Sequence, residues 1–103
     1  MAKSDLEESF ANYLRLHRIE YQREYKFSPK TRHRADFYLP QYNCLIEIEG
    51  GIWSGGRHGR GAGYIKDCDK YNLATTLGYK LLRFTTQHVQ DSQYDALHKI
   101  LGN

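Results

Sequence analysis

The sequence predicts an α/β domain in which a mixed sheet is flanked by helices. Segments whose residues alternate in polarity, as strands do, lie between segments with helical spacing. The predicted elements follow in the order αβββαβα, an arrangement typical of helices packed on one sheet. The 103 residues, with 40% hydrophobic and 26% charged side chains, suit one compact domain spanning 1–103.

A first helix is expected to start near Ser4. Ser4 and Glu7 have the spacing of a capping box, in which each side chain binds a backbone N–H of the first turn. The apolar residues that follow fall on one helical face, which would pack on the sheet. They are Leu6, Phe10, Tyr13 and Leu14.

Three strands are predicted over residues 21–27, 34–39 and 44–49. A turn at 40–43 joins the second and third, so these two are expected to be antiparallel neighbours. In the first strand, Tyr21, Arg23, Tyr25 and Phe27 share one side. In the second, Ala35, Phe37 and Leu39 oppose Asp36 and Tyr38, and in the third Cys44, Ile46 and Ile48 oppose Leu45, Glu47 and Glu49.

A glycine-rich loop is predicted over residues 50–63, which hold seven of the nine glycines. A loop this long in a small domain is uncommon and often functional. A helix is predicted over 64–77, ending at Gly78. A strand over 79–85 and a last helix over 93–101 complete the chain.

Composition indicates the class of partner and the compartment. The net charge of +3 permits a polyanionic partner without demanding one. No apolar run approaches the length of a membrane span and no N-terminal stretch resembles a signal peptide, so we expect a cytoplasmic protein without membrane contact. Cationic side chains surround the acidic residues described below: Arg32, His33, Arg34, Arg57, His58, Arg60, Lys66 and Lys70.

The two cysteines, Cys44 and Cys68, are interpreted as buried thiols, because a disulfide framework in so short a chain needs more of them. A zinc site formed by these cysteines and His58 is an alternative with poor ligand spacing.

Acidic residues on the second and third strands form the candidate site. Antiparallel pairing places Asp36 near Glu47 or Glu49. Close carboxylates repel one another, and a divalent cation such as Mg²⁺ removes that conflict. Each acid also has a structural explanation: a solvated strand residue, an ion pair with Arg34, or a turn cap for Asp36. The capping box alone explains Glu7.

The motifs in this region resemble the PD-(D/E)XK nuclease superfamily. The segments Arg34-Ala35-Asp36-Phe37-Tyr38-Leu39-Pro40 and Leu45-Ile46-Glu47-Ile48-Glu49-Gly50 are similar to its central motif. Within the superfamily, the chain is most similar to the very-short-patch repair endonucleases and their small phage and bacterial relatives. The similarity covers about residues 5–85. It includes the Trp/His/Gly loop Gly50–His58, the pair Asp67 and Lys70, and the strand Leu77-Gly78-Tyr79-Lys80-Leu81-Leu82-Arg83.

The resemblance implies a restriction-endonuclease-like αβββαβ core and specific roles for residues. Asp36 and Glu47 would bind Mg²⁺, for which Mn²⁺ can substitute, and the carbonyl of Ile48 would add a ligand. Glu7 would be the acid on the first helix, with the adjacent Glu8 as an alternative.

One position departs from the family pattern. The family often has lysine two residues after the central acid, where this chain has Glu49. In some members the basic residue lies on the following helix, so Lys70 is the candidate replacement and Lys66 the second choice. Glu49 would instead bind metal or act as a base for water.

The resemblance further implies a metal-dependent DNA endonuclease. Its substrate would be a branched structure such as a Holliday junction, or a nicked or mismatched duplex, with functions in recombination or repair. A junction resolvase would be a homodimer. Loop residues would contact DNA or simply be structural. The candidate DNA-binding residues are Arg34, Trp53, Arg57, His58, Arg60 and Lys66. The alternative is a DNA-binding module of the same fold without catalysis.

Overall fold

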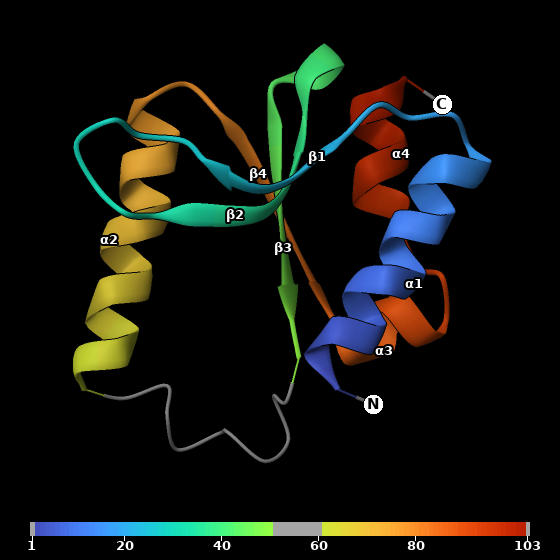
Figure 1. Ribbon diagram of the computed structural model, residues 1–103, viewed down its shortest axis with the longest axis horizontal. Coiled ribbons are helices and arrows are strands. Elements are labelled where there is room, and N and C mark those ends of the chain that lie inside the picture. The colour runs from blue at the N-terminus through green and yellow to red at the C-terminus, as the bar shows by residue number, and fades with distance from the viewer. Residues whose placement is uncertain (1, 51–60, 103) are drawn as a thin grey trace.

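A computed structural model describes residues 2–50 and 61–102 and confirms the mixed α/β arrangement (Figure 1). The four strands form one sheet in the order β1-β2-β3-β4, in which β3 and β4 are parallel and the other neighbours antiparallel. The elements are α1 (Lys3–Leu16), β1 (Gln22–Lys26), β2 (Arg34–Leu39), the 3-10 helix η1 (Pro40–Tyr42), β3 (Cys44–Glu49), α2 (Ala62–Thr76), β4 (Lys80–Thr85), α3 (Thr86–Gln90) and α4 (Asp95–Leu101).

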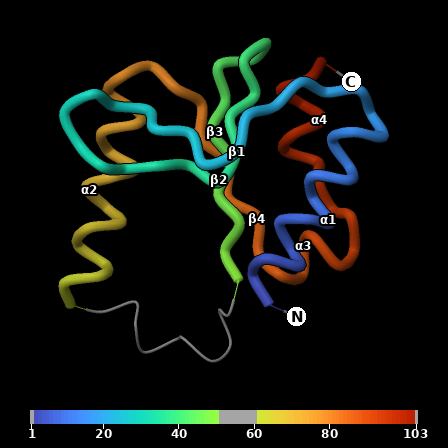
Figure 2. The backbone as a smooth tube through the Cα atoms, in the orientation of Figure 1, coloured from blue at the N-terminus to red at the C-terminus, as the bar shows by residue number. Residues whose placement is uncertain are grey.

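Helices cover both faces of the sheet. Figure 1 shows α2 on one side and α1, α3 and α4 on the other, and Figure 2 shows the hairpin of β1 and β2 lying across β3. Parallel strands cannot be joined by a tight turn, which is why the connection from β3 to β4 includes α2.

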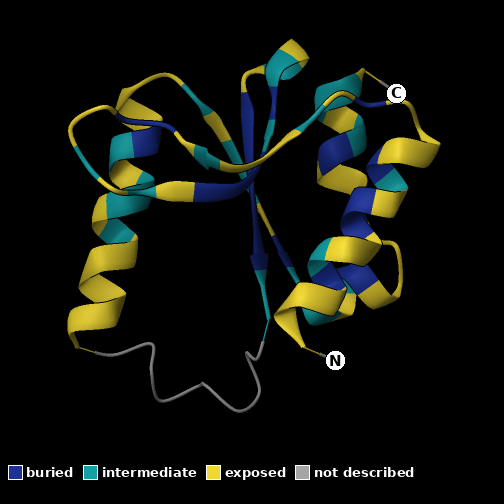
Figure 3. Ribbon diagram, viewed as in Figure 1, coloured by how far each residue is buried: buried dark blue, intermediate teal, exposed yellow. Residues whose placement is uncertain are grey.

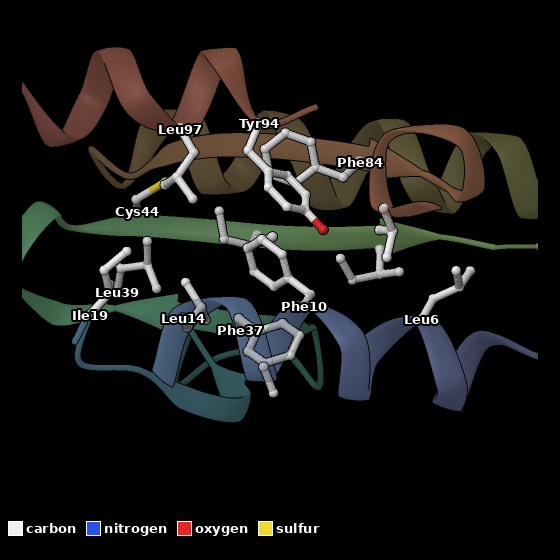
Figure 4. Packing of buried hydrophobic residues seen from close by; sticks show 14 residues of the cluster. Leu6, Phe10, Leu14, Ile19, Phe37, Leu39, Cys44, Phe84, Tyr94 and Leu97 are labelled. Atoms are coloured by element: carbon white, nitrogen blue, oxygen red, sulfur yellow. The ribbon is translucent and has the colours of Figure 1, made fainter. Parts of the chain in front are cut away.

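The larger hydrophobic cluster lies between the sheet and α1, α3 and α4 (Figure 4). Phe10 is fully buried at its centre, with its ring centroid 5.1 Å from that of Phe37, 5.7 Å from Phe84 and 5.2 Å from Tyr94. Edge-to-face and tilted aromatic pairs of this kind add to the burial of apolar area. Phe10 therefore joins α1 to three other elements.

The smaller cluster lies under α2 and contains Phe27, Ala35, Leu45 and Ala74. Figure 3 shows that burial is concentrated on the central strands, whereas the outer helix surfaces are exposed. In β3 the predicted alternation is confirmed. Cys44, Ile46 and Ile48 pack in the larger cluster and Leu45 packs in the smaller one, so Glu47 and Glu49 extend from the face that α2 covers.

The predicted alternation in the first two strands holds only in part: Phe37 and Leu39 oppose Tyr38 as expected, but other residues change face. In β2, Phe37 packs in the larger cluster but Ala35 in the smaller one. In the first predicted strand, Tyr21, just before β1, packs against the larger cluster but Tyr25 of β1 against the smaller one. Between these two residues Glu24 has a φ of 49°, which interrupts the extended backbone on which the two-residue period of β1 depends.

The predicted capping box at the first helix is also wrong. The helix begins at Lys3, with Ala2 as its N-cap and no capping side chain, so Ser4 already lies inside the first turn. A capping box does occur at α3, a helix that the sequence analysis missed, where Thr85 and His88 bind each other's backbone N–H.

Several boundaries also differ from those predicted. The second helix begins at Ala62 rather than residue 64 and the last helix at Asp95 rather than 93. Within residues 2–50 and 61–102, no helix combines the length and apolar character that a membrane crossing requires.

Replacing Phe10 by alanine is expected to lower the free energy of unfolding by about 3–5 kcal/mol, because the lost ring leaves a cavity between α1 and the sheet. Denaturant unfolding would measure the change. The matched control is Leu16→Ala on the same helix, whose side chain is 80% exposed and whose loss should cost no more than about 0.5 kcal/mol. Equal effects of the two substitutions would contradict the assigned core.

Candidate functional site

The site forms where β2 separates from β3. The strands pair up to Phe37 and Ile46, and the next residues, Asp36 and Glu47, are joined by side chains instead. The N–H of Asp36 donates to Glu47 Oε2 over 3.0 Å, and the N–H of Ile48 donates to Asp36 Oδ2 over 2.7 Å. The two carboxylates thus satisfy backbone groups that the diverging strands no longer pair.

These bonds orient both acids although each is buried. Asp36 is 7% exposed and Glu47 is 6% exposed. The predicted proximity of Asp36 to Glu47 is therefore confirmed.

A lysine binds the second oxygen of each carboxylate. Lys3 Nζ lies 3.3 Å from Asp36 Oδ1, and Lys70 Nζ lies 2.8 Å from Glu47 Oε1. Each acid is held by a backbone N–H on one oxygen and by an ammonium group on the other. A buried charge needs such partners to remain ionised.

The ionisation of these groups reflects burial and neighbouring charge. Burial raises the pKa of Glu47, and the hydrogen bond and charge of Lys70 oppose that rise. Burial also raises the pKa of Glu7, and the negative charge of Asp36 adds to the rise. Burial lowers the pKa of Lys3, but attraction to Asp36 and Glu7 outweighs it, so the pKa of this ammonium lies above its ordinary value.

The first helix contributes Glu7 rather than Glu8. The Glu7 side chain is 15% exposed and lies 4.0 Å from Lys3 and 3.5 Å from Arg23. Glu8 is 59% exposed and pairs with Arg23 on the outside. Carboxylate oxygens of Glu7, Asp36 and Glu24 lie within 4.8 Å of one another, the one such group of potential metal ligands among the described residues.

Gly50 lets α1 approach the end of β3. A Cβ atom on this residue would lie 3.2 Å from Leu6 Cδ1 and 3.3 Å from Lys3 Cβ, closer than most such contacts allow. A side chain at position 50 would therefore move Lys3 away from Asp36.

Glu49 does not join the two central acids. Its carboxylate accepts hydrogen bonds from Arg83 over 3.4 Å and from the hydroxyl of Tyr71 over 3.5 Å. The Arg83 guanidinium lies 4.3 Å from the centre of the Tyr71 ring. Burial, followed by the charge of Glu49, raises the pKa of Tyr71. These contacts connect β3, β4 and α2 beside the site.

The remaining predicted site residues are more scattered. Arg34 is exposed on β2, two residues before Asp36, and Lys66 is exposed on α2, one turn before Lys70. The other predicted DNA contacts lie outside the described residues: Trp53, Arg57, His58 and Arg60.

The structure gives the zinc alternative no support. Cys44 is buried in the larger cluster, where burial raises the pKa of its thiol to about 11, whereas Cys68 lies on α2 over the opposite face. Both cysteines are free. The prediction of two buried thiols holds for Cys44, but Cys68 is only half-buried.

Sequence reasoning missed four residues in or beside the site: Lys3, Glu24, Tyr71 and Arg83. Lys3 had a detectable signal, since it precedes Glu7 by the four residues typical of a helical ion pair. Tyr71 follows Lys70 on the predicted helix, and Arg83 alternates with apolar neighbours in β4. Glu24 had no clear signal, because its place opposite Asp36 depends on the strand register.

Comparisons of the chain with models of protein families, with curated proteins and with solved structures found no match.

Replacing Lys70 by methionine is expected to destabilise the fold by about 3 kcal/mol at neutral pH, because it leaves the carboxylate of Glu47 buried without its cation. The pKa of Glu47 would rise further, so the folded variant would bind a proton more tightly than the unfolded chain. The deficit should therefore shrink as the pH falls through that raised pKa. Denaturant unfolding at several pH values measures it.

Lys66→Met is the matched control, since Lys66 is exposed on the same helix. It should change stability little at any pH. A Lys70→Met deficit that does not vary between neutral and acidic pH would contradict the pairing with Glu47.

Proposed function

We propose that this chain is a metal-dependent nuclease that hydrolyses phosphodiester bonds in DNA. The observation that carries the proposal is the pair of buried carboxylates, Asp36 and Glu47, held by backbone N–H groups with Lys70 beside them. A pair of oriented acids next to a lysine is the arrangement that the resemblance to PD-(D/E)XK nucleases implies.

The donor atoms fit a hard divalent cation. Asp36 Oδ1 and Glu47 Oε1 are the oxygens that backbone groups leave to ammonium partners, and the carbonyl of Ile48 would add a third oxygen. Mg²⁺ prefers oxygen ligands of this kind and Mn²⁺ can replace it. A bound cation would neutralise charge that develops on phosphorus and favour ionisation of water.

The residues of the chain would divide the remaining work. Lys70, which contacts Glu47 Oε1 before a cation takes that oxygen, would place its positive charge beside the scissile phosphate and orient the attacking water. Glu7 would accept a hydrogen bond from that water or from one bound to the cation. The water would lose one proton to solvent as its oxygen bonds to phosphorus, one P–O ester bond would break, and the leaving oxygen would take up a proton from solvent.

The contacts of Glu49 favour Lys70 as the replacement for the family lysine. The Glu49 carboxylate is engaged by Arg83 and Tyr71, whereas Lys70 reaches Glu47. The presence of Glu49 where the family often has lysine is also the best support for the alternative, a DNA-binding module of this fold without catalysis.

A structure-selective substrate suits a domain of this size, which has little surface for reading a long sequence. We propose branched DNA such as a four-way junction, or a nicked duplex. Resolving a junction requires two active sites and hence a homodimer, so chromatographic mass with and without a junction separates a resolvase from a monomeric nicking enzyme.

Cleavage of labelled linear duplex, nicked duplex and four-way junction should require Mg²⁺ or Mn²⁺ and stop in EDTA. Asp36→Asn and Glu47→Gln should each reduce the rate by roughly a hundredfold to a thousandfold, since both remove charge that stabilises the transition state. Their amide oxygens can still accept the backbone N–H bonds of Ile48 and Asp36, so the fold and DNA binding should persist.

Lys99→Met serves as a control and should leave cleavage unchanged, because Lys99 is exposed on α4, away from the candidate site. Cleavage that survives in both acid variants would refute the mechanism. Binding without cleavage under every metal would establish the inactive module instead.

Replacing Lys3 by glutamine is expected to tighten Mn²⁺ binding, because the ammonium and the metal compete for Asp36 Oδ1. The expected gain in affinity is about twofold to fivefold, which corresponds to the free energy of a partly exposed ion pair. Isothermal titration calorimetry without DNA measures the affinity directly. Lys66→Gln removes the same charge from an exposed position and should leave the affinity unchanged. Wild-type binding of Mn²⁺ together with an unaltered affinity in Lys3→Gln would rule out this competition.

A further inference from the structure

We infer that the tip of the β1–β2 hairpin, residues 26–34, is an arm that binds the phosphate backbone of duplex DNA beside the site. The inference rests on the proposed function, since it assigns a substrate-binding surface to the same site. Three features of this segment support it: its positive charge, the contacts that fix its conformation, and its position beside the site.

The segment carries only positive charge. Lys26, Lys30, Arg32 and Arg34 are all exposed, and no acidic residue occurs between Tyr25 and Ala35. None of these four cations takes part in an ion pair with another described residue. Lys3, Arg23, Lys70 and Arg83 by contrast are paired with carboxylates. The hairpin cations therefore remain available to a partner.

The tip is held in place by its own contacts. Phe27 is buried in the smaller cluster under α2, and its ring stacks on that of His33 at a centroid distance of 6.2 Å. The N–H of Lys30 donates to Ser28 Oγ and the N–H of His33 donates to Thr31 Oγ1. Less conformational freedom is then lost when the cations meet an anion, which favours binding.

The arm is continuous with the site. Arg34 precedes Asp36 by two residues on the same strand, a separation of roughly 7 Å. Lys26 pairs with Arg34 across the hairpin, so two cations lie side by side at its base. Lys30 and Arg32 lie further out, in the connection between the two strands.

This layout fits a duplex. A cationic surface that starts beside the acids would hold the backbone that leads into the site, and a two-stranded ribbon has dimensions that the major groove of B-DNA admits. Contacts of Lys and Arg with phosphates release counterions, so the binding they provide weakens steeply with salt.

The test compares two double variants that each lose two positive charges. Lys30→Gln/Arg32→Gln changes the arm, and Arg18→Gln/Lys99→Gln changes exposed residues of α4 and of the segment after α1, across the sheet. Fluorescence anisotropy with a labelled 30-base-pair linear duplex in EDTA, at a series of NaCl concentrations, measures affinity without cleavage. Thermal unfolding verifies that both variants are folded.

We expect the arm variant to bind about tenfold more weakly and the slope of log affinity against log salt to fall by roughly 1.8, with the control pair close to wild type. An arm variant that binds as tightly as wild type, or a control pair that loses as much, would overturn the inference. Loss specific to the arm in a protein that cleaves nothing would support the arm and refute the nuclease. Cleavage by the wild-type protein, together with unchanged DNA binding by the arm variant, would support the nuclease and refute the arm.

Discussion

The reciprocal hydrogen bonds between Asp36, Glu47 and the backbones of β2 and β3 are the constraint on which the site depends. Where two strands diverge, their N–H groups must find other acceptors, because an unpaired buried donor is costly. Here carboxylates supply them, so the same bonds that end the ladder also orient two acids. A pair of oriented, buried carboxylates thus arises from the need to satisfy the backbone where two strands separate.

Two buried carboxylates require compensating charge, and the helices on both faces provide it. α1 contributes Lys3 and α2 contributes Lys70, and the absence of a side chain at Gly50 lets the start of α1 come close. The oxygens that these lysines bind are the ones a divalent cation would take in the proposed nuclease. Glu49 pairs with Arg83 and leaves Glu47 to Lys70 of α2.

The order of elements and the alternation in β3 could be predicted because they depend on local periodicity, which burial on two opposite faces imposes. The change of face within β1 could not, because the left-handed backbone of Glu24 is invisible in a hydrophobic pattern. The capping box expected at Ser4 did not form although its spacing was present: the helix begins at Lys3, and the Glu7 side chain pairs with Lys3 in the same helix and with Arg23 of β1.

The sequence by itself determined the class of fold and the acids Glu7, Asp36, Glu47 and Glu49 as candidates, because residue type and strand order are written in it. Only the tertiary structure showed that Glu7 lies nearer Asp36 than the exposed Glu8 and that Lys70 reaches Glu47, and it alone brought Glu24 opposite Asp36. Those choices depend on strand register and on how helices pack across the sheet. Register and packing join residues far apart in the chain, which no local pattern records.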